Sequence, residues 1–455
     1  MQRLNPHPYQ FEAIKFLLQN SHAGLFFDPG LGKTACVLAA LLVLKQKGMF
    51  KRALVVAPRR VANNVWPAEK NKWLDFAGLS LQVLHGSKKN EMLAKPLADI
   101  CVVTPEGLSW LQEREAFPII DADVLVIDES SYFRNGTTQR FKALRPRLSM
   151  FKRRIILTGT PAPRSYEDLW SQIFILDRGG ALGPYISHYR NAYFVDVGYG
   201  YPDWKLRDGS DKIINEKIRP LVLRGDSVDH LEMPKLIYNT VVVGLPPAAR
   251  DVYDEFEREF YIRIDGQDIE APTAAVAFNK LRQASNGFLY TADGMVSLLH
   301  EEKLDALEGL VAELQGQSAL ILYEYQFDKA QILRRFPQAK VIGGGTSERD
   351  AATAIAEFNA GTLQLLLAHP ASAGHGINLQ DKANHIIWYA PTVNLEHFVQ
   401  ATARVWRQGN PHERVFVHTI AVRDSVEERV AAMLASKGRT QESLLNSLKS
   451  PIVVT

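Results

Sequence analysis

The sequence predicts an α/β protein with two tandem, doubly wound parallel-sheet lobes and helical insertions at the lobe junction. In the first half of the chain, short apolar runs alternate with amphipathic stretches, and the last third repeats this alternation. Between them lies an irregular region rich in glycine and tyrosine. Continuous apolar runs are typical of strands buried on both faces of a parallel sheet, and their alternation with helices is typical of the doubly wound class.

The apolar runs and periodic segments give the expected elements of each lobe. The strands expected in the first lobe are 25–27, 54–57, 99–103, 124–127 and 155–157, with helices at 34–46 and 66–76. The strands expected in the second lobe are 319–323, 340–342, 363–368, 385–389 and 415–419, with a helix at 349–360. Gly361 is expected to end that helix, because glycine readily adopts the left-handed conformation of a helix C-terminus.

The region between the lobes sets the predicted domain organisation. We place the first lobe at 1–235, with an insertion at about 177–235, and the second at 236–455. The second lobe has a helical insertion at about 246–300, with helices expected at 247–265 and 272–287, followed by its α/β part at about 301–455. The first insertion interleaves tyrosines with cations. These aromatic side chains could stack on bases or wedge a duplex open, or they could form a small satellite core.

Composition excludes several classes of protein. The chain has 455 residues, of which 46% are hydrophobic and 23% charged, and this balance excludes a disordered or fibrous protein. The formal net charge of +3 means that any nucleic-acid surface must be local. The longest clean apolar run, 35–44, is about half of the roughly 20 residues that a membrane span needs. Cys36 and Cys101 are expected to be inert core thiols in a reducing cytoplasm, bacterial or that of a host cell.

The strongest local signal is the segment Asp28–Thr34 (DPGLGKT), which follows an expected strand and precedes an expected helix. This is the context of a phosphate-binding loop. Gly30 and Gly32 let backbone N–H groups approach a polyphosphate at the positive end of the helix. Lys33 is expected to reach the β and γ phosphates, and the Thr34 hydroxyl to ligate Mg²⁺.

A second signal is the run Val124–Glu129 (VLVIDE), a buried strand that ends in two carboxylates. Ligands of open α/β sheets bind at the carboxyl ends of the strands. Asp128 is therefore expected to hold Mg²⁺, and Glu129 to act as general base on an attacking water. In isolation the same run would fit a strand that ends in a solvated acidic turn.

A third signal is the segment Gln400–Gly409 (QATARVWRQG), in which Arg404 and Arg407 are spaced i, i+3. On a helix they would share one face and could act as arginine fingers that stabilise charge on a γ-phosphate. The alternative is a basic surface helix without a catalytic role.

Taken in order, these segments resemble the motifs of superfamily-two helicases and translocases, and most closely those of the Swi/Snf-like DNA-dependent ATPases. The resemblance covers most of the chain, and it implies RecA-like lobes. Besides the segments above, it rests on 7–10 (HPYQ), 57–73, 104–106 (TPE), 157–161 (LTGTP), 218–235, 302–304 (EKL) and 372–380 (SAGHGINLQ).

The resemblance implies a minimal motor of a bacterium or a bacterial virus, with ATP and Mg²⁺ as cofactors. ATP would lie between the lobes, where Glu129, Arg404 and Arg407 act in catalysis. The implied nucleotide-binding residues are Gln10, Gly30, Gly32, Lys33, Thr34, Asp128, Gly376 and Gln400, with Thr34 and Asp128 as the Mg²⁺ ligands. The implied nucleic-acid contacts are Arg59, Thr104, Thr158 and Ser372, and alone Arg59 would fit a solvated loop.

The chain departs from the family pattern at several positions. Phe27 replaces the first glycine of the phosphate loop, and Ser130-Ser131 replace the usual Ala-His or Ala-Asp after Glu129. We expect DNA, duplex or branched, as the partner ahead of RNA, with no membrane partner and no indicated protein partner. The alternatives are a strand-separating helicase on DNA or RNA, and an ATP-binding nucleic-acid-binding module without motor activity.

Overall fold

The structure is a computed structural model, which describes residues 3–226, 231–259, 261–264, 267–270, 273–291, 293–373 and 377–447. The chain folds as two compact units, which we call lobe 1 (Met1–Leu231 and Lys437–Thr455) and lobe 2 (Glu232–Ser436). The sequence placed the boundary at residue 235 and the entire C-terminal segment in the second lobe. The last helix, α19 (Val426–Ser447), instead ends in lobe 1, where Leu444 and Leu445 join a hydrophobic core. None of the described helices is long and apolar enough to cross a membrane.

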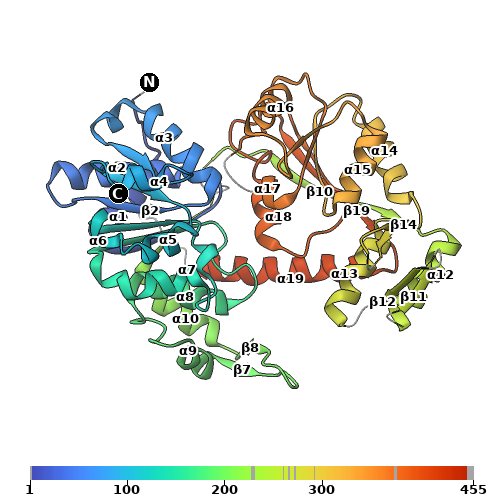
Figure 1. The fold of residues 1–455 in the computed structure, drawn as a ribbon, viewed down its shortest axis with the longest axis horizontal. Coiled ribbons are helices and arrows are strands. Elements are labelled where there is room, and N and C mark those ends of the chain that lie inside the picture. Colours follow the sequence, from blue (N-terminus) through green and yellow to red (C-terminus); the bar gives the residue numbers. More distant parts are fainter. Residues whose placement is uncertain are drawn as a thin grey trace. The chain divides into compact units, whose positions relative to one another are not determined.

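Lobe 1 contains a seven-stranded parallel sheet with the order β3-β4-β2-β5-β6-β1-β9 (Figure 1). The strands are β1 (His22–Phe27), β2 (Ala53–Val56), β3 (Leu81–Val83), β4 (Ile100–Val103), β5 (Val124–Asp128), β6 (Arg153–Thr158) and β9 (Val222–Gly225). Neighbouring strand residues face opposite cores, since Leu25 and Val55 belong to one cluster and Phe26 and Leu54 to the other. Burial on both faces explains why these strands read as continuous apolar runs.

Helices cover both faces of this sheet. They are α1 (Pro8–Gln19), α2 (Lys33–Gln46), α3 (Trp66–Lys72), α4 (Lys89–Leu93), α5 (Gly107–Glu113), α6 (Phe117–Ile120), α7 (Gln139–Leu144), α8 (Leu169–Asp177), α9 (Ile186–Tyr193) and α10 (Ser210–Ile218). The core of α1 and α2 includes Leu17 and Leu41, whereas the core of α5, α7 and α8 includes Phe141 and Trp170. Both predicted core thiols, Cys36 and Cys101, are buried and free.

The insertion that follows α8 is more regular than its composition suggested. After α9 the chain forms an antiparallel hairpin of β7 (Phe194–Asp196) and β8 (Trp204–Leu206), which projects from lobe 1 in Figure 1. Tyr189 and Phe194 are buried in the lobe 1 core, so the satellite-core interpretation holds for them. Tyr199 and Tyr201 at the hairpin tip are fully exposed instead.

Lobe 2 contains a six-stranded parallel sheet with the order β10-β19-β18-β15-β17-β16. Its strands are β10 (Lys235–Val243), β15 (Ala319–Leu322), β16 (Lys340–Ile342), β17 (Leu365–Ala368), β18 (His385–Trp388) and β19 (Arg414–Val422). Its helices, besides α19, are α12 (Pro247–Glu259), α13 (Ala274–Ser285), α14 (Glu302–Glu313), α15 (Gln326–Arg335), α16 (Glu348–Ala360), α17 (Pro370–Ala373) and α18 (Leu395–Thr402). Two hairpins, β11 (Tyr261–Ile264) with β12 (Gln267–Glu270) and β13 (Phe288–Tyr290) with β14 (Val296–Leu298), complete the helical insertion. The predicted fold class, two parallel-sheet α/β lobes with insertions, is therefore confirmed.

Two predicted helices were too long. The helix expected at 247–265 ends at Glu259, because the alternating segment Tyr261–Ile264 pairs as strand β11. The helix expected at 66–76 ends at Lys72, and Leu74–Gly78 forms a separate 3₁₀ turn. Helix α16 ends as predicted, with Gly361 in the left-handed conformation at φ 79°.

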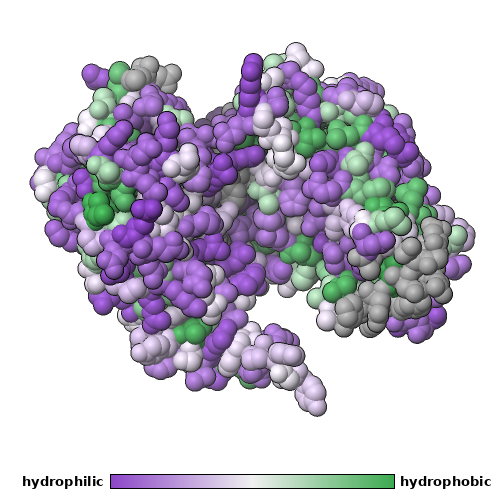
Figure 2. All heavy atoms as spheres, in the orientation of Figure 1, coloured by the Kyte–Doolittle hydropathy of each residue, from purple (hydrophilic) through white to green (hydrophobic). Residues whose placement is uncertain are grey.

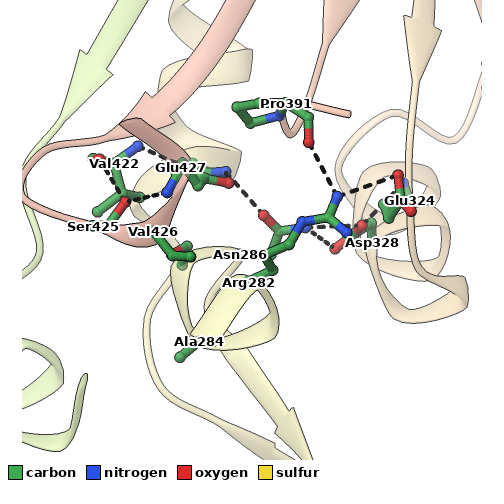
Figure 3. A network of polar contacts seen from close by, with 12 residues as sticks. Arg282, Ala284, Asn286, Glu324, Asp328, Pro391, Val422, Ser425, Val426 and Glu427 are labelled. Atoms are coloured by element: carbon green, nitrogen blue, oxygen red, sulfur yellow. Dashed lines mark hydrogen bonds and ion pairs between the residues drawn. The ribbon is translucent and has the colours of Figure 1, made fainter. Parts of the chain in front are cut away.

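A buried polar network holds the insertion of lobe 2 to its α/β part (Figure 3). Lys303 on α14 and Glu427 on α19 form an ion pair in which both side chains are at most 1% exposed. Lys303 also donates to Asn286 at 2.9 Å, and Asn286 donates to both carboxylate oxygens of Asp328 at 3.0 Å. Burial lowers the pKa of Lys303 and raises that of Asp328 to about 7. Breaking one such contact leaves a charge without a partner in the protein interior.

We predict that Lys303→Met destabilises lobe 2 by about 3–5 kcal/mol, because the Glu427 carboxylate stays buried without its cation. Urea unfolding followed by circular dichroism measures the loss. Lys340→Met is the matched control, since its ion pair with Glu357 is at least one-third exposed on both sides and is worth about 1 kcal/mol or less. Equal unfolding midpoints for the two variants would contradict the assigned role of the buried pair.

Candidate nucleotide site

The predicted phosphate loop lies between the end of β1 and the start of α2. Gly30 and Gly32 have φ angles of 97° and 73°, and Gly32 is the N-cap of α2. Lys33 and Thr34 are the first two residues of that helix. The Lys33 ammonium donates to the carbonyl oxygens of Phe27 at 2.7 Å and Asp28 at 3.1 Å. The lysine is therefore folded back over its own loop, at the positive end of a 14-residue helix.

Gln10 lies against this loop. Its Oε1 accepts from the backbone N–H of His7 at 2.9 Å, which closes a capping box on α1, and its Nε2 donates to the Leu31 carbonyl at 3.2 Å. A Cβ built on Gly32 would lie 2.4 Å from the Gln10 Nε2. The structure therefore brings together the predicted glutamine and the predicted loop. The left-handed backbone angle favours glycine at position 32, and a side chain there would also displace the Gln10 amide.

Asp128 ends β5 and is 9% exposed. One carboxylate oxygen accepts from the indole Nε1 of Trp66 at 2.8 Å. Burial raises the pKa of Asp128, while the Trp66 hydrogen bond and the positive charge of Lys33 act in the opposite direction. Asp128 thus lies within electrostatic reach of the phosphate loop. An oxygen-donor set of one carboxylate and the Thr34 hydroxyl fits Mg²⁺, which takes most of its ligands from water and substrate phosphates.

Glu129 has a left-handed backbone with φ 64° and ψ 68°, which is rare for a residue with a side chain. Its Oε1 accepts two hydrogen bonds, from the Ser131 hydroxyl at 3.1 Å and from the Thr158 hydroxyl at 2.8 Å. Thr158 in turn accepts from the backbone N–H of Thr160 at 3.0 Å. The carboxylate of the predicted general base is therefore oriented by the two loops that follow β5 and β6.

The two serines that depart from the family pattern both have a defined role in the fold. Ser131 contacts Glu129 directly, as described above. The Ser130 hydroxyl donates to Gln172 Oε1 at 2.7 Å, and Gln172 Nε2 donates to the Pro161 carbonyl at 2.7 Å. Gln172 on α8 thus links the segment after Glu129 to the LTGTP segment. Sequence reasoning missed this link because it depends on a residue outside both motifs.

Arg224 is a further site residue that sequence reasoning gave no role. Its side chain is 5% exposed and pairs with Asp28 at 3.1 Å and with Asp226. It also donates to the carbonyl of Phe26 at 3.0 Å. Strand β9, which carries Arg224, pairs with β1, so a residue 196 positions away in sequence holds the start of the phosphate loop. No local sequence signal marks this contact.

In lobe 2 the predicted arginines contact the segment Ile377–Asn378. Arg404 donates to the Ile377 carbonyl at 3.2 Å and to the Gln400 carbonyl at 3.1 Å, and Arg407 donates to the Asn378 side chain. The expectation that both lie on one helix face was wrong, because α18 ends at Thr402 and both follow it in turns.

The other predicted nucleotide contacts of lobe 2 fall in different settings. Gln400 is 3% exposed and donates to Glu396 at 3.4 Å. Gly376 lies outside the described residues.

The four predicted nucleic-acid contacts fall in different settings. Arg59 is exposed just after β2, and Ser372 is partly exposed on α17. Thr104 is 5% exposed, and its hydroxyl accepts from the Gly107 N–H at 3.3 Å. Thr158 is fully buried, and its hydroxyl donates a hydrogen bond to Glu129. The prediction that this side chain contacts nucleic acid therefore does not fit the structure, where it contacts the predicted general base.

Comparisons with known proteins identify the family. The family model of the SNF2-related domain matches residues 9–288, and that of the helicase conserved C-terminal domain matches residues 302–409. The chain is 30% identical to "Putative protein p41" of Acyrthosiphon pisum secondary endosymbiont phage 1, over 99% of this chain and 100% of that protein.

Two larger proteins are also similar. The "Putative ATP-dependent helicase/translocase YwqA" of Bacillus subtilis is 26% identical over 97% of this chain, and the "ISWI chromatin-remodeling complex ATPase ISW1" of Saccharomyces cerevisiae is 25% identical over 98%. The chain spans 49% and 41% of the lengths of these two proteins.

We predict that Gly32→Ala destabilises lobe 1 more than Gly48→Ala, as measured by thermal unfolding. Both glycines have positive φ, 73° and 65°, so both substitutions strain the backbone by about 1–2 kcal/mol. Only at Gly32 does the added Cβ meet another group, Gln10 Nε2, whereas nothing lies within 4 Å at Gly48. Equal shifts in melting temperature would show that the Gln10 contact is not tight.

Proposed function

The chain belongs to the SNF2-related family, and from this premise we propose that it is an ATP-dependent DNA motor, which hydrolyses ATP to move along or remodel DNA. The observation that carries the proposal is the oriented carboxylate of Glu129 in the same lobe as the phosphate loop that leads into α2 at Lys33 and Thr34. A general base and a phosphate cradle on one sheet edge are what hydrolysis of a nucleoside triphosphate requires.

Lobe 1 supplies the groups that bind the nucleotide in this proposal. Backbone N–H groups of the loop and the N-terminus of α2 receive the phosphates, and Lys33 leaves its carbonyl partners to reach them. Gln10 already contacts the loop and would bind the adenine base of the nucleotide. Thr34 and Asp128 would hold Mg²⁺, which neutralises charge on the phosphate oxygens when it is bound.

Hydrolysis then depends on Glu129 and on the two arginines. Glu129 orients a water molecule and accepts its proton as the water oxygen attacks the γ-phosphorus and the bond to the β-phosphate oxygen breaks. Its Oε1 is held by Ser131 and Thr158, so the carboxylate is positioned before the nucleotide arrives. Arg404 and Arg407 of lobe 2 would stabilise the charge on the γ-phosphoryl group. Neither lobe then carries the complete set of groups, so hydrolysis would require lobe closure.

The proposed DNA contacts are to the backbone, through Arg59, Thr104 and Ser372 and neighbouring N–H groups. Contacts of this kind fix position without reading sequence, and they make binding strongly dependent on salt. The helicase-type family model in lobe 2 and the relatives that are named translocase and chromatin-remodelling ATPase support DNA as the substrate. The alternatives remain a strand-separating helicase on DNA or RNA and a binding module without productive hydrolysis.

We expect ATP hydrolysis to be stimulated by DNA and to fall about 10²- to 10⁴-fold in Glu129→Gln, because the amide cannot accept the proton. The measurement is phosphate release with duplex DNA, forked DNA, four-way junctions, single strands and RNA. Glu113→Gln, at the exposed end of α5, is the matched control and should keep full activity.

The pattern of stimulation separates the candidate functions. Stimulation by duplex or branched DNA supports the motor proposal, and stimulation by RNA alone would refute it. Hydrolysis of ATP by Glu129→Gln at the wild-type rate would contradict the assignment of Glu129 as general base. Failure of the wild-type protein to hydrolyse ATP with any of the nucleic acids would favour the binding module.

A further inference from the structure

Lobe 1 contains a cavity of about 370 Å³ that none of the predicted site residues lines. Its walls come from the loop 134–137, which follows the catalytic Glu129, the loop 164–167 after the LTGTP segment, and the start of the insertion at 185–190, together with Arg145 and Trp170. This volume falls in the range of sites for small molecules or parts of larger ligands. On the face shown in Figure 2, hydrophilic side chains predominate over α7 and α8, the elements next to these segments.

The lining of the cavity is strongly cationic. It includes Arg134, Arg145, Arg164 and Arg190, but one carboxylate, Glu167. Arg190 donates to Glu167 at 2.7 Å, and Arg164 pairs with the buried Asp168. Arg145 has uncharged neighbours: it donates to the Pro184 carbonyl at 3.2 Å and lies over the rings of Phe174 and Tyr185.

Aromatic rings contact two of these guanidinium groups. The Arg145 guanidinium carbon is 4.9 Å from the Phe174 ring centroid, and that of Arg190 is 5.4 Å from the Trp204 ring centroid. A guanidinium group fixed by stacking keeps its planar N–H edges available for bidentate contact with an oxyanion. Four arginines against the carboxylates of Glu167 and Asp168 leave the site with an excess of positive charge. This excess favours an anionic ligand with several oxygens, and phosphate fits this description.

We propose that this cavity, which we call the arginine cavity, binds a backbone phosphate of DNA. This inference rests on the proposed function. The hairpin that leaves the same insertion favours nucleic acid over an acidic peptide. Its tip is ordered by Asp196, which accepts from the N–H groups of Gly198 and Asp203, and it exposes Tyr199 and Tyr201 completely. The hairpin reaches the cavity through Trp204 on β8, whose ring lies against the Arg190 guanidinium. Aromatic rings combined with cations are typical of surfaces that bind nucleic acid by stacking bases.

Helix α8 connects the arginine cavity to the catalytic segment. Trp170 lines the cavity, the Ser171 hydroxyl donates to the Phe133 carbonyl at 2.5 Å, and Gln172 bonds Ser130 and Pro161. The loop 134–137 is continuous with Glu129 through the 3₁₀ turn Ser130–Phe133. A phosphate bound in the cavity therefore contacts the segment that positions the general base, and this gives DNA a route to stimulate hydrolysis.

The test compares Arg145→Ala and Arg145→Ala/Arg190→Ala with wild type in binding to a fluorescent duplex, measured by anisotropy over a series of salt concentrations. We expect the dissociation constant of the double variant to rise about tenfold, and the slope of log K against log salt to fall by about 1, as for one lost phosphate contact. Hydrolysis without DNA should stay unchanged, and its stimulation by DNA should fall.

Three controls keep the result interpretable. Arg114→Ala removes an exposed arginine at the end of α5 and should match wild type. Arg145→Lys/Arg190→Lys keeps the charge and should restore part of the affinity. Because Arg145 has contacts with one carbonyl and two rings, Arg145→Ala is expected to fold even if the double variant does not.

The possible outcomes separate this inference from the proposed function. Unchanged affinity and salt slope in a folded double variant overturn the arginine cavity as a DNA site, even where DNA stimulates the wild-type protein. Loss of binding to inorganic phosphate or to poly-glutamate, with DNA binding intact, also overturns it and assigns the cavity to a free anion or an acidic peptide. If DNA does not stimulate wild-type hydrolysis, the proposed motor fails, while the affinity measurement still decides whether the cavity binds DNA.

Discussion

The parallel pairing of three neighbouring strands is the constraint on which the site depends. Strands β1, β6 and β5 are adjacent in one sheet, with Phe26 opposite Thr158 and Asp128 opposite Leu157. Parallel strands end at the same edge, so the loops that follow them meet there. The phosphate loop, Glu129 and the hydroxyl that orients it are thereby brought together from segments about 130 residues apart in the chain. The chemistry of lobe 1 follows from this register.

Much of the first lobe could be predicted because its signals are local. Strands buried on both faces read as apolar runs, so the sequence correctly predicted that Lys33 lies in the turn before a helix and that Asp128 ends a buried strand. Contacts between distant segments left no such mark. The ion pair of Arg224 with Asp28 and the two hydrogen bonds to Glu129 depend on which strands are neighbours in the sheet. The i, i+3 spacing of Arg404 and Arg407 predicted a helix, but α18 ends before them.

The substitution of serines after Glu129 shows how one family pattern is rebuilt with different side chains. In this chain the Ser131 hydroxyl donates directly to Glu129, and the Ser130 hydroxyl is linked to the Pro161 carbonyl through Gln172. Both serines are fully buried, so these hydrogen bonds are formed in a dry environment, where leaving one partner unpaired is costly. Glu129 is consequently held in an unusual backbone conformation by its surroundings.

The proposed function assigns Arg404 and Arg407 to the γ-phosphate of a nucleotide that the phosphate loop holds. The most direct measurement is ATP binding and single-turnover hydrolysis by Arg407→Ala at saturating duplex DNA. We expect ATP affinity to change little, because lobe 1 carries the phosphate loop, and hydrolysis to slow by about 10³-fold or more, as for loss of an arginine finger. Hydrolysis at the wild-type rate in this variant and in Arg404→Ala would show that neither arginine acts on the γ-phosphate.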